Sequence, residues 1–426
     1  MSFPEIDEGV EYIGYRDAIN LIYSNVEPVG IEELPIETCV GRIAADNIVA
    51  QVDSPASDVS LKDGYAVRSN DLITASKKKA VRLALIGNAY AGSNFEGKVF
   101  AGTAVKICSG SEIPVGADAV VAGEFCQEES STVFIRANAE AGRNILGCGI
   151  DVKAGEKIAG TGQVLMPGRL GLLAAAGIQR LRVFRKPKVA IIAVGDEVVA
   201  PGVKLQPGQL YASNLVTIGA WLSLIGISYT TIIVKDNKGA IRKELLKQLS
   251  DVDAILTSGG AWGSERDLTV KVLDDINWHK HFHRVRMGPG KGVALGTWNG
   301  KSIFCLPGGP SSNEMAFLQL ALPGILRIAG QSQKPFQIIN AKLACNVEGR
   351  HQAWTEFKEA FLSYDSEGNY VVTPFKMKSR LQSIADVSCL LCIPEGKTSL
   401  RAGQVVDVQI LIPTPGGLSI TGNTRL

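Results

Sequence analysis

Residues 253–267 read Asp-Ala-Ile-Leu-Thr-Ser-Gly-Gly-Ala-Trp-Gly-Ser-Glu-Arg-Asp, and this stretch indicates the fold of its surroundings. The apolar run at 253–256 predicts a buried strand, and the apolar residues after Asp267 can open a helix. A glycine-rich loop between a strand and a helix presents backbone N–H groups to an anion. An ordinary strand–helix turn is an equally open interpretation of the loop alone. Three glycines let the backbone approach a ligand closely: Gly259, Gly260 and Gly263.

The same alternation of strand and helix continues on both sides of this loop. Apolar runs predict strands at 189–194, 229–234 and 303–306, and helical periodicity predicts helices at 214–224, 240–249 and 311–328. Near-continuous apolar strands that alternate with helices indicate a parallel sheet covered on both faces. Ligands of such sheets bind beyond the carboxyl ends of the strands. The loops expected there are 195–197, 257–267 and 307–310.

The remaining segments differ in character and predict a multidomain α/β plus β protein. Helical spacing occurs at 15–24 and 167–176, residues 26–52 read as a connecting segment, and short strands with turns fill 53–138 and 335–426. We therefore expect four domains. They are a discontinuous, helix-rich first domain with short strands (1–52 and 139–182), an inserted β-rich domain (53–138), an α/β domain (183–331) and a C-terminal β domain (332–426).

Composition limits the classes of function. The chain has 426 residues, 46% hydrophobic and 20% charged, with 44 Lys and Arg against 42 Asp and Glu. Such a balance gives no indication of nucleic-acid binding. No apolar run approaches the roughly 20 residues of a membrane span, and the acidic N-terminus is no secretory signal. We expect a cytoplasmic protein whose eight cysteines are reduced.

Two motifs suggest metal binding, but each has a simpler interpretation. Cys389-Leu-Leu-Cys392 has the spacing of a metal or redox pair, yet it lies in a predicted buried strand without a second pair nearby in sequence. His279, His281 and His283 share one face of a predicted strand, and an exposed strand face is the favoured reading. No Walker loop and no dinucleotide-binding fingerprint is present, which weakens an NTPase or dehydrogenase interpretation.

Carboxylates follow several of the predicted strands. Glu197, Asp236 and Asp267 belong to the α/β loops, and Asp63 comes from the β-rich segment. Clustered carboxylates beside an anion repel one another unless a cation lies between them, which points to Mg²⁺. A helix cap or a solvated surface group remains the alternative for each carboxylate alone. The bare turn Pro307–Pro310 suits an oxyanion, and we expect Ser311 or Ser312 to cap the helix that follows it.

The chain resembles the MoeA proteins and the gephyrin E domain, the molybdopterin molybdenumtransferase family. The resemblance rests on motifs in the order typical of the family: Lys-Asp-Gly-Tyr-Ala-Val-Arg at 62–68, Ile-Cys-Ser-Gly at 107–110, Pro-Val-Gly-Ala-Asp-Ala-Val-Val at 114–121, Val-Gly-Asp-Glu-Val at 194–198, Ser213-Asn214, Ser258 to Asp267, Pro-Gly-Lys at 289–291 and Leu-Pro-Gly-Gly-Pro at 306–310.

The resemblance implies a role in molybdenum cofactor biosynthesis: Mg²⁺-dependent insertion of molybdate or tungstate into adenylylated molybdopterin, with release of AMP. It implies a doubly wound, MogA-like α/β domain with an inserted β-rich domain and a C-terminal β-barrel-like domain. It also implies a homodimer whose active site lies between subunits, with the upstream adenylyltransferase and downstream molybdoenzyme chaperones as partners. The alternatives are a non-catalytic molybdopterin carrier or scaffold, and a molybdopterin adenylyltransferase. The extra domains and Asp63-Gly-Tyr-Ala66 argue against the adenylyltransferase.

The resemblance also assigns roles to residues. The catalytic set that it implies is Asp63, Ser109, Glu197, Asp236 and Asp267, of which Glu197, Asp236 and Asp267 would hold the metal. The implied binding residues are Ser258, Gly259, Gly260, Gly263, Ser264, Arg284, Lys291, Pro307, Pro310, Arg350 and Ser383.

Several positions depart from the usual family pattern: Lys62, Trp262, Arg266, Arg284, Gly288 and Gly309. Positive charge is relocated rather than lost, because Lys62, Arg266, Arg284 and Arg286 are expected to remain available for phosphates. These departures fit a retuned pocket, a different oxyanion such as tungstate, or a divergent paralogue.

Overall fold

The computed structural model of the chain describes residues 11–93, 95–260, 268–332, 335–375, 381–385 and 387–411. The chain divides into two compact units, one of Met1–Ile31 with Phe184–Leu426 and one of Glu32–Val183. The finer division into four domains stays a prediction. Within the described ranges, no helix is both long and apolar enough to cross a bilayer.

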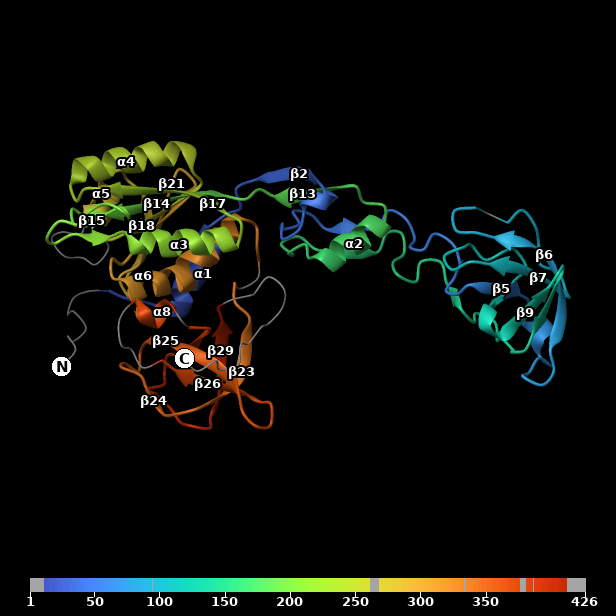
Figure 1. Cartoon of the computed structure of the whole chain (residues 1–426). Coiled ribbons are helices and arrows are strands. Elements are labelled where there is room, and N and C mark those ends of the chain that lie inside the picture. Colours follow the sequence, from blue (N-terminus) through green and yellow to red (C-terminus); the bar gives the residue numbers. More distant parts are fainter. Residues whose placement is uncertain are drawn as a thin grey trace. The chain divides into compact units, whose positions relative to one another are not determined.

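A six-stranded sheet runs through the larger unit in the order β17-β14-β18-β22-β21-β19, and Figure 1 labels β14, β17, β18 and β21. Four neighbours are parallel, as expected: β17 (Ser228–Val234), β14 (Lys188–Val194), β18 (Ala254–Ser258) and β22 (Lys301–Leu306). The expectation of a wholly parallel sheet is wrong beyond β22. There β21 (Ala294–Trp298) pairs antiparallel with both β22 and β19 (His279–His283). Asn299 and Gly300, with φ of 47° and 77°, form the two-residue hairpin turn between β21 and β22.

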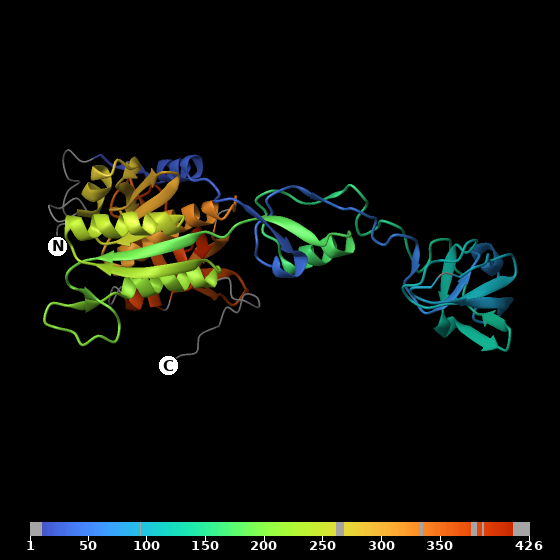
Figure 2. The ribbon, with the colours of Figure 1, turned by 90° about the horizontal axis from the view of Figure 1, so that it is seen from above.

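Helices cover both faces of this sheet. Ile191 of β14 belongs to a core shared with α1 (Tyr15–Asn25) and α3 (Ser213–Leu224), whereas Ile192 belongs to a core shared with α4 (Lys238–Asp251) and α5 (Leu268–Asp275). Successive residues of a strand point to opposite faces, so β14 is buried on both sides. The yellow-green helices α3 and α4 flank the green strands (Figures 1 and 2). Burial of each such isoleucine contributes about 1.5–3 kcal/mol.

The helix predicted at 311–328 is continuous but irregular. It comprises α6 (Pro310–Ala316), a π-helical turn (Phe317–Ala321) and α7 (Leu322–Ile328). Pro323 has no N–H and therefore cannot continue the regular hydrogen-bond ladder, which accounts for the widened turn before it. Gln319 in this turn exchanges side-chain hydrogen bonds with Gln409 of the C-terminal region.

The C-terminal region is a closed five-stranded barrel in the order β25-β26-β23-β29-β27, sealed by pairing of β25 with β27. Its strands are β23 (Ile338–Leu343), β25 (Thr355–Tyr364), β26 (Tyr370–Pro374), β27 (Cys389–Ile393) and β29 (Val405–Ile410). Beyond β25 the same sheet continues through two parallel neighbours, β20 (Val285–Gly288) and β1 (Ile13–Gly14).

The smaller unit is rich in strands, as predicted. A six-stranded sheet has the order β8-β5-β7-β6-β10-β9, formed by β5 (Gly64–Val67), β6 (Val81–Ala89), β7 (Thr103–Ile107), β8 (Ala119–Ala122), β9 (Cys126–Glu129) and β10 (Thr132–Ile135). The remainder contains α2 (Pro167–Ala175) and two-stranded sheets. Residues 26–52, expected as a connecting segment, include β2 (Ile31–Pro35) and β3 (Ile48–Val49), so that expectation is wrong.

Candidate functional site

The four parallel strands end together at one edge of the sheet. Val194 is in register with Val234, and Ser258 is in register with both Ala193 and Leu306. The loops that begin at Gly195, Lys235, Gly259 and Pro307 therefore start at the same edge, as the sequence predicts. We call this set of loop starts the rim.

A polar network joins three chain segments at the rim. Asn214 Nδ2, from the first turn of α3, donates to Ser258 Oγ at 2.9 Å and to the Gly308 carbonyl at 2.9 Å. Asn313 Nδ2, from α6, donates to the same Ser258 Oγ at 3.1 Å and to the Pro307 carbonyl at 2.7 Å. Carbonyl oxygens only accept, so the two carbonyls fix which way both amides point. Ser258 is thus a joint acceptor of two amide donors.

This network determines what the Ser258 hydroxyl can do. A hydroxyl has two acceptor lone pairs and one donor proton. Both lone pairs are used by the two asparagines, so the O–H of Ser258 is left to act as a donor. A buried hydroxyl held in this state suits an anion. The sequence identified Ser258 but assigned no role to Asn214 or Asn313. The available signal was an asparagine near the start of each predicted helix.

The backbone conformation and the close packing of this loop both require glycine at positions 259 and 260. Their φ angles are +96° and +69°, which side chains other than glycine rarely adopt. A Cβ at Gly259 would lie 2.6 Å from the Val194 carbonyl oxygen, and one at Gly260 would lie 2.5 Å from Thr269 Oγ1. Close packing of this loop on β14 and α5 therefore explains both glycines, and their approach to a ligand stays a prediction.

Three carboxylates follow the ends of β14 and β17: Asp196, Glu197 and Asp236. A Cβ at Gly195 would lie 2.7 Å from Glu197 Oε2, so the Glu197 carboxylate folds back over this glycine. Asp236 Oδ1 is shielded from solvent. The Asp236 N–H donates to Asp196 Oδ1 at 3.3 Å, which makes Asp196 a rim carboxylate that the sequence analysis missed, although it adjoins Glu197.

Several predicted residues of the glycine-rich loop lie outside the described residues: Trp262, Gly263, Ser264, Arg266 and Asp267. The predicted meeting of Asp267 with Glu197 and Asp236 therefore stays a prediction.

The turn at 307–310 lies at the rim as expected, but the helix begins differently. Pro310 is the first residue of α6 and Gly309 is its N-cap, without a side-chain cap bond. The expected cap at Ser311 or Ser312 is therefore wrong. Proline suits the first helical position because its fixed φ is helical and its missing N–H would have no helical partner there.

The remaining binding candidates lie near β20 and the barrel. Arg284 and Lys291, half-buried, flank β20, and Ser383 is buried in α8 (Gln382–Ala385). The Arg350 N–H and the His351 N–H both donate to Glu356 Oε1, the latter at 3.2 Å. Glu356, only 5% exposed, thus holds the backbone of the segment that carries Arg350.

Arg286, which the sequence analysis expected to remain available for phosphates, is engaged by partners within the protein. Its guanidinium donates to the Tyr12 carbonyl at 2.7 Å and to the Ala353 carbonyl at 3.2 Å, and it lies 3.5 Å from Glu395 Oε1. These hydrogen bonds connect β20 to the residues that precede β1 and β25, because Arg286 lies inside β20, between these two strands.

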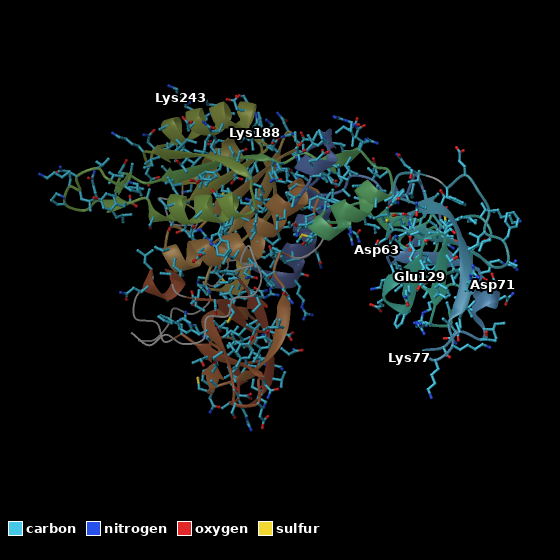
Figure 3. All side chains as sticks on the ribbon, turned by 45° about the vertical axis from the view of Figure 1, so that its right-hand side comes forward. Asp63, Asp71, Lys77, Glu129, Lys188 and Lys243 are labelled. Carbon is cyan, nitrogen blue, oxygen red and sulfur yellow. The ribbon has the colours of Figure 1, made fainter. Side chains whose placement is uncertain are left out.

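In the smaller unit, Asp63 and Ser109 are brought together. The Ser109 N–H donates to Asp63 Oδ1 at 2.8 Å, although the residues are 46 positions apart. Both side chains are exposed, as is Lys62, and Figure 3 shows Asp63 on this β-rich unit. Gly64 is held tightly beside it, because a Cβ there would lie 2.0 Å from the Val121 carbonyl oxygen. The turn therefore presents an oriented carboxylate.

The alternative metal motifs gain no support. Burial raises the pKa of Cys389 to about 12 and that of Cys392 to about 11, whereas a metal ligand must be a thiolate. His281 Nε2 lies 3.1 Å from Thr297 Oγ1, so one ring nitrogen of His281 is already engaged by a side chain. Throughout the described part of the chain, no three His, Cys, Asp or Glu side chains are grouped as metal ligands.

Comparisons with known proteins agree with this architecture. Family models match at residues 13–177 (MoeA N-terminal region, domains I and II), 190–327 (probable molybdopterin binding domain) and 341–411 (MoeA C-terminal region, domain IV). A molybdopterin molybdenumtransferase of Haemophilus influenzae is 30% identical over 90% of this chain and 94% of its own. One of Staphylococcus epidermidis is 30% identical over 93% and 95%. A crystal structure of a molybdopterin biosynthesis MoeA protein from Pyrococcus horikosii has a TM-score of 0.77 and 32% identity, covering 94% of this chain and 99% of that one.

The rim, the barrel and the matched regions together define a multidomain protein with a molybdopterin-binding type of α/β domain. The chain belongs to the MoeA family of molybdopterin molybdenumtransferases, since relatives at 30% identity extend over nine-tenths of its length.

Proposed function

We propose that this protein inserts molybdate into adenylylated molybdopterin and releases AMP, as a step of molybdenum cofactor biosynthesis. Family membership and the names of the relatives support the reaction class. The single observation that carries the proposal is the Ser258 hydroxyl, which two amide donors hold as a hydrogen-bond donor at the rim. A nucleotide-linked pterin offers phosphate oxygens as acceptors for such a group.

The described residues suit the binding of that substrate. Ser258 would donate to a phosphate oxygen, and Gly259 and Gly260 would let the phosphates lie close to the backbone. In the smaller unit, the Ser109 N–H holds Oδ1 of Asp63, which leaves Oδ2 of this carboxylate to accept a proton from water. Gly263 and Ser264 lie outside the described residues, and their proposed role in extending the phosphate contacts rests on the family resemblance alone.

The family implies Mg²⁺, and the donor types at the rim fit this ion. Mg²⁺ prefers oxygen ligands and is often held by one or two carboxylates together with substrate phosphates and water. Glu197 and Asp236, with Asp267, would hold it, and Asp236 Oδ1 is already withdrawn from solvent. When bound, the ion would offset the charge of the phosphoanhydride.

Molybdate itself, or tungstate, is a substrate oxyanion. The binding region of this oxyanion would be formed by Pro307, Pro310, Arg284, Lys291, Arg350 and Ser383. Lysine and arginine supply charge-assisted donors to such an anion.

The working form would be a cytoplasmic homodimer. Exposed apolar side chains on α3 and the preceding segment support a protein contact there: Val203, Leu205, Leu210, Tyr211, Val216 and Leu224. The upstream adenylyltransferase and a downstream molybdoenzyme chaperone would be transient partners.

AMP release tests the proposal directly. Purified protein with adenylylated molybdopterin, molybdate and Mg²⁺ should release AMP, measured by chromatography, and Ser258→Ala should slow release by about 10-fold or more. Ser302→Ala, a buried serine of the neighbouring strand β22, is the matched control and should retain activity. Release no faster than in a protein-free mixture would contradict the proposal, and tight pterin binding without turnover would favour a carrier. Consumption of ATP with free molybdopterin would favour an adenylyltransferase.

A further inference from the structure

The ammonium of Lys291 lies against two aromatic rings. Lys291 Nζ is 5.9 Å from the centroid of the Tyr12 ring and 5.7 Å from that of Trp354. The two rings are 5.7 Å apart, and the His351 ring lies 5.3 Å from Trp354. A cation within about 6 Å of a ring centroid is attracted to the ring face, most strongly to that of tryptophan.

Three neighbouring parallel strands build this arrangement. Tyr12 immediately precedes β1 and Trp354 immediately precedes β25, so both rings lie at the same end of the sheet. Lys291 follows β20 between them, and the Val285 N–H donates to its carbonyl at 3.0 Å, which returns Lys291 to the start of β20. Arg286 donates to the carbonyls of Tyr12 and Ala353 and thereby fixes the backbone beside both rings.

If residue 354 served only to fill the core, tryptophan would cost more free energy than phenylalanine. Trp354 is 6% exposed, and its buried indole N–H has no hydrogen-bond partner among the residues that the structure describes. An unsatisfied buried donor costs about 1–3 kcal/mol, a cost that phenylalanine would avoid. The indole offers instead a larger and more electron-rich face to a cation.

We propose that Tyr12 and Trp354 are positioning residues, which hold the Lys291 ammonium in place for a substrate oxyanion. Fixing a flexible lysine before binding lowers the entropy that is lost when the anion binds. The identity of the anion, molybdate or tungstate, rests on the proposed function, whereas the position of Lys291 does not.

The position of Lys291 can be measured without any substrate. Reductive methylation with ¹³C-formaldehyde gives each lysine an NMR resonance, and Lys291→Arg identifies that of Lys291. We expect a ring-current shift of this resonance in the wild-type chain, retained in Trp354→Phe, reduced in Trp354→Leu and lost when Tyr12→Leu is added to Trp354→Leu. An unshifted Lys291 resonance in the wild type would overturn the proposal, whether or not AMP is released.

Tungstate binding by calorimetry supplies the functional readout. Trp354→Phe should weaken binding about 2–5-fold while the melting temperature stays unchanged or rises, and Trp354→Leu should weaken it about 5–30-fold. A purely structural tryptophan would instead lower the melting temperature without this graded loss. In the Lys291→Met background Trp354→Leu should have no further effect; a full additional loss would refute the positioning role. Tyr12→Phe, which keeps the ring, should bind tungstate better than Tyr12→Leu.

Discussion

Asn214 Nδ2 donates to Ser258 Oγ across 2.9 Å and so joins the first turn of α3 to the end of β18. The same Ser258 oxygen accepts from Asn313, which is anchored on the Pro307 carbonyl. One oxygen therefore connects three of the segments that form the rim, and the geometry of the rim depends on both amides.

Asn313→Asp should damage both stability and activity. The aspartate places an oxygen where the amide donates, so the contact with the Pro307 carbonyl becomes repulsive. The Ser258 O–H would turn to donate to the carboxylate and would no longer be left for a ligand. We expect the free energy of unfolding to fall by about 1–3 kcal/mol and AMP release to fall about 10-fold or more. Denaturant titration and the AMP assay measure these effects, with Asn20→Asp on the exposed face of α1 as the control. Wild-type activity in Asn313→Asp would show that the network is dispensable.

Gly259→Ala and Gly202→Ala form a matched pair. Their φ angles are +96° and +90°, so both substitutions introduce similar backbone strain of about 1–3 kcal/mol. Only the Gly259 Cβ would meet backbone, 2.6 Å from the Val194 carbonyl oxygen, whereas nothing lies within 4 Å at Gly202. Gly259→Ala should therefore be the more destabilising of the two in denaturant titrations. Equal losses would mean that the loop can move away from β14.

Gly195→Ala should change the Mg²⁺ dependence of AMP release while leaving the free energy of unfolding almost unchanged. The new Cβ would lie 2.7 Å from Glu197 Oε2, the end of a flexible exposed side chain that can move away at little cost. We expect the free energy of unfolding to change by less than about 0.5 kcal/mol. The Mg²⁺ concentration for half-maximal AMP release should rise about 10-fold. An unchanged Mg²⁺ requirement would remove Glu197 from the proposed metal site.

Glu314 should make stability depend on pH. Burial raises the pKa of this carboxyl above 4.5, although the Trp221 Nε1–H donates to it at 2.8 Å. Because the folded protein binds the proton more tightly, this contribution is complete below pH 4.5 and is lost as pH rises through the folded-state pKa. Glu314→Gln keeps a neutral acceptor, so its stability relative to wild type should be higher at pH 8 than at pH 4. The same difference at both pH values would contradict a raised pKa.

The sequence predicted the elements that periodicity controls and missed those that depend on distant contacts. The buried strands β14 and β18 and the helices α1, α2 and α3 were predicted because continuous or periodic apolar residues leave few alternatives. The antiparallel edge was missed even though Asn299-Gly300, a strong hairpin signal, marks it.

In the candidate site too, local patterns predicted some residues, whereas distant contacts determine the others. Ser258, Gly259 and Gly260 were identified because a loop between strand and helix has a local signature. The amides of Asn214 and Asn313 and the carboxylate of Asp196 acquire their partners only through folding, and the backbone partners of Arg286 lie 274 and 67 positions away in sequence. No local pattern specifies contacts of that range.

The helical segment from Pro310 to Ile328 has a mechanical consequence. Its first turns carry Asn313 at the rim, and its π-helical turn carries Gln319, which is bonded to Gln409 of the barrel and to Tyr15 of α1. The segment thus couples the hydrogen-bond network of Ser258 to the barrel. A displacement of the barrel would be transmitted along this helix to Asn313 and would alter the hydrogen bonds of Ser258.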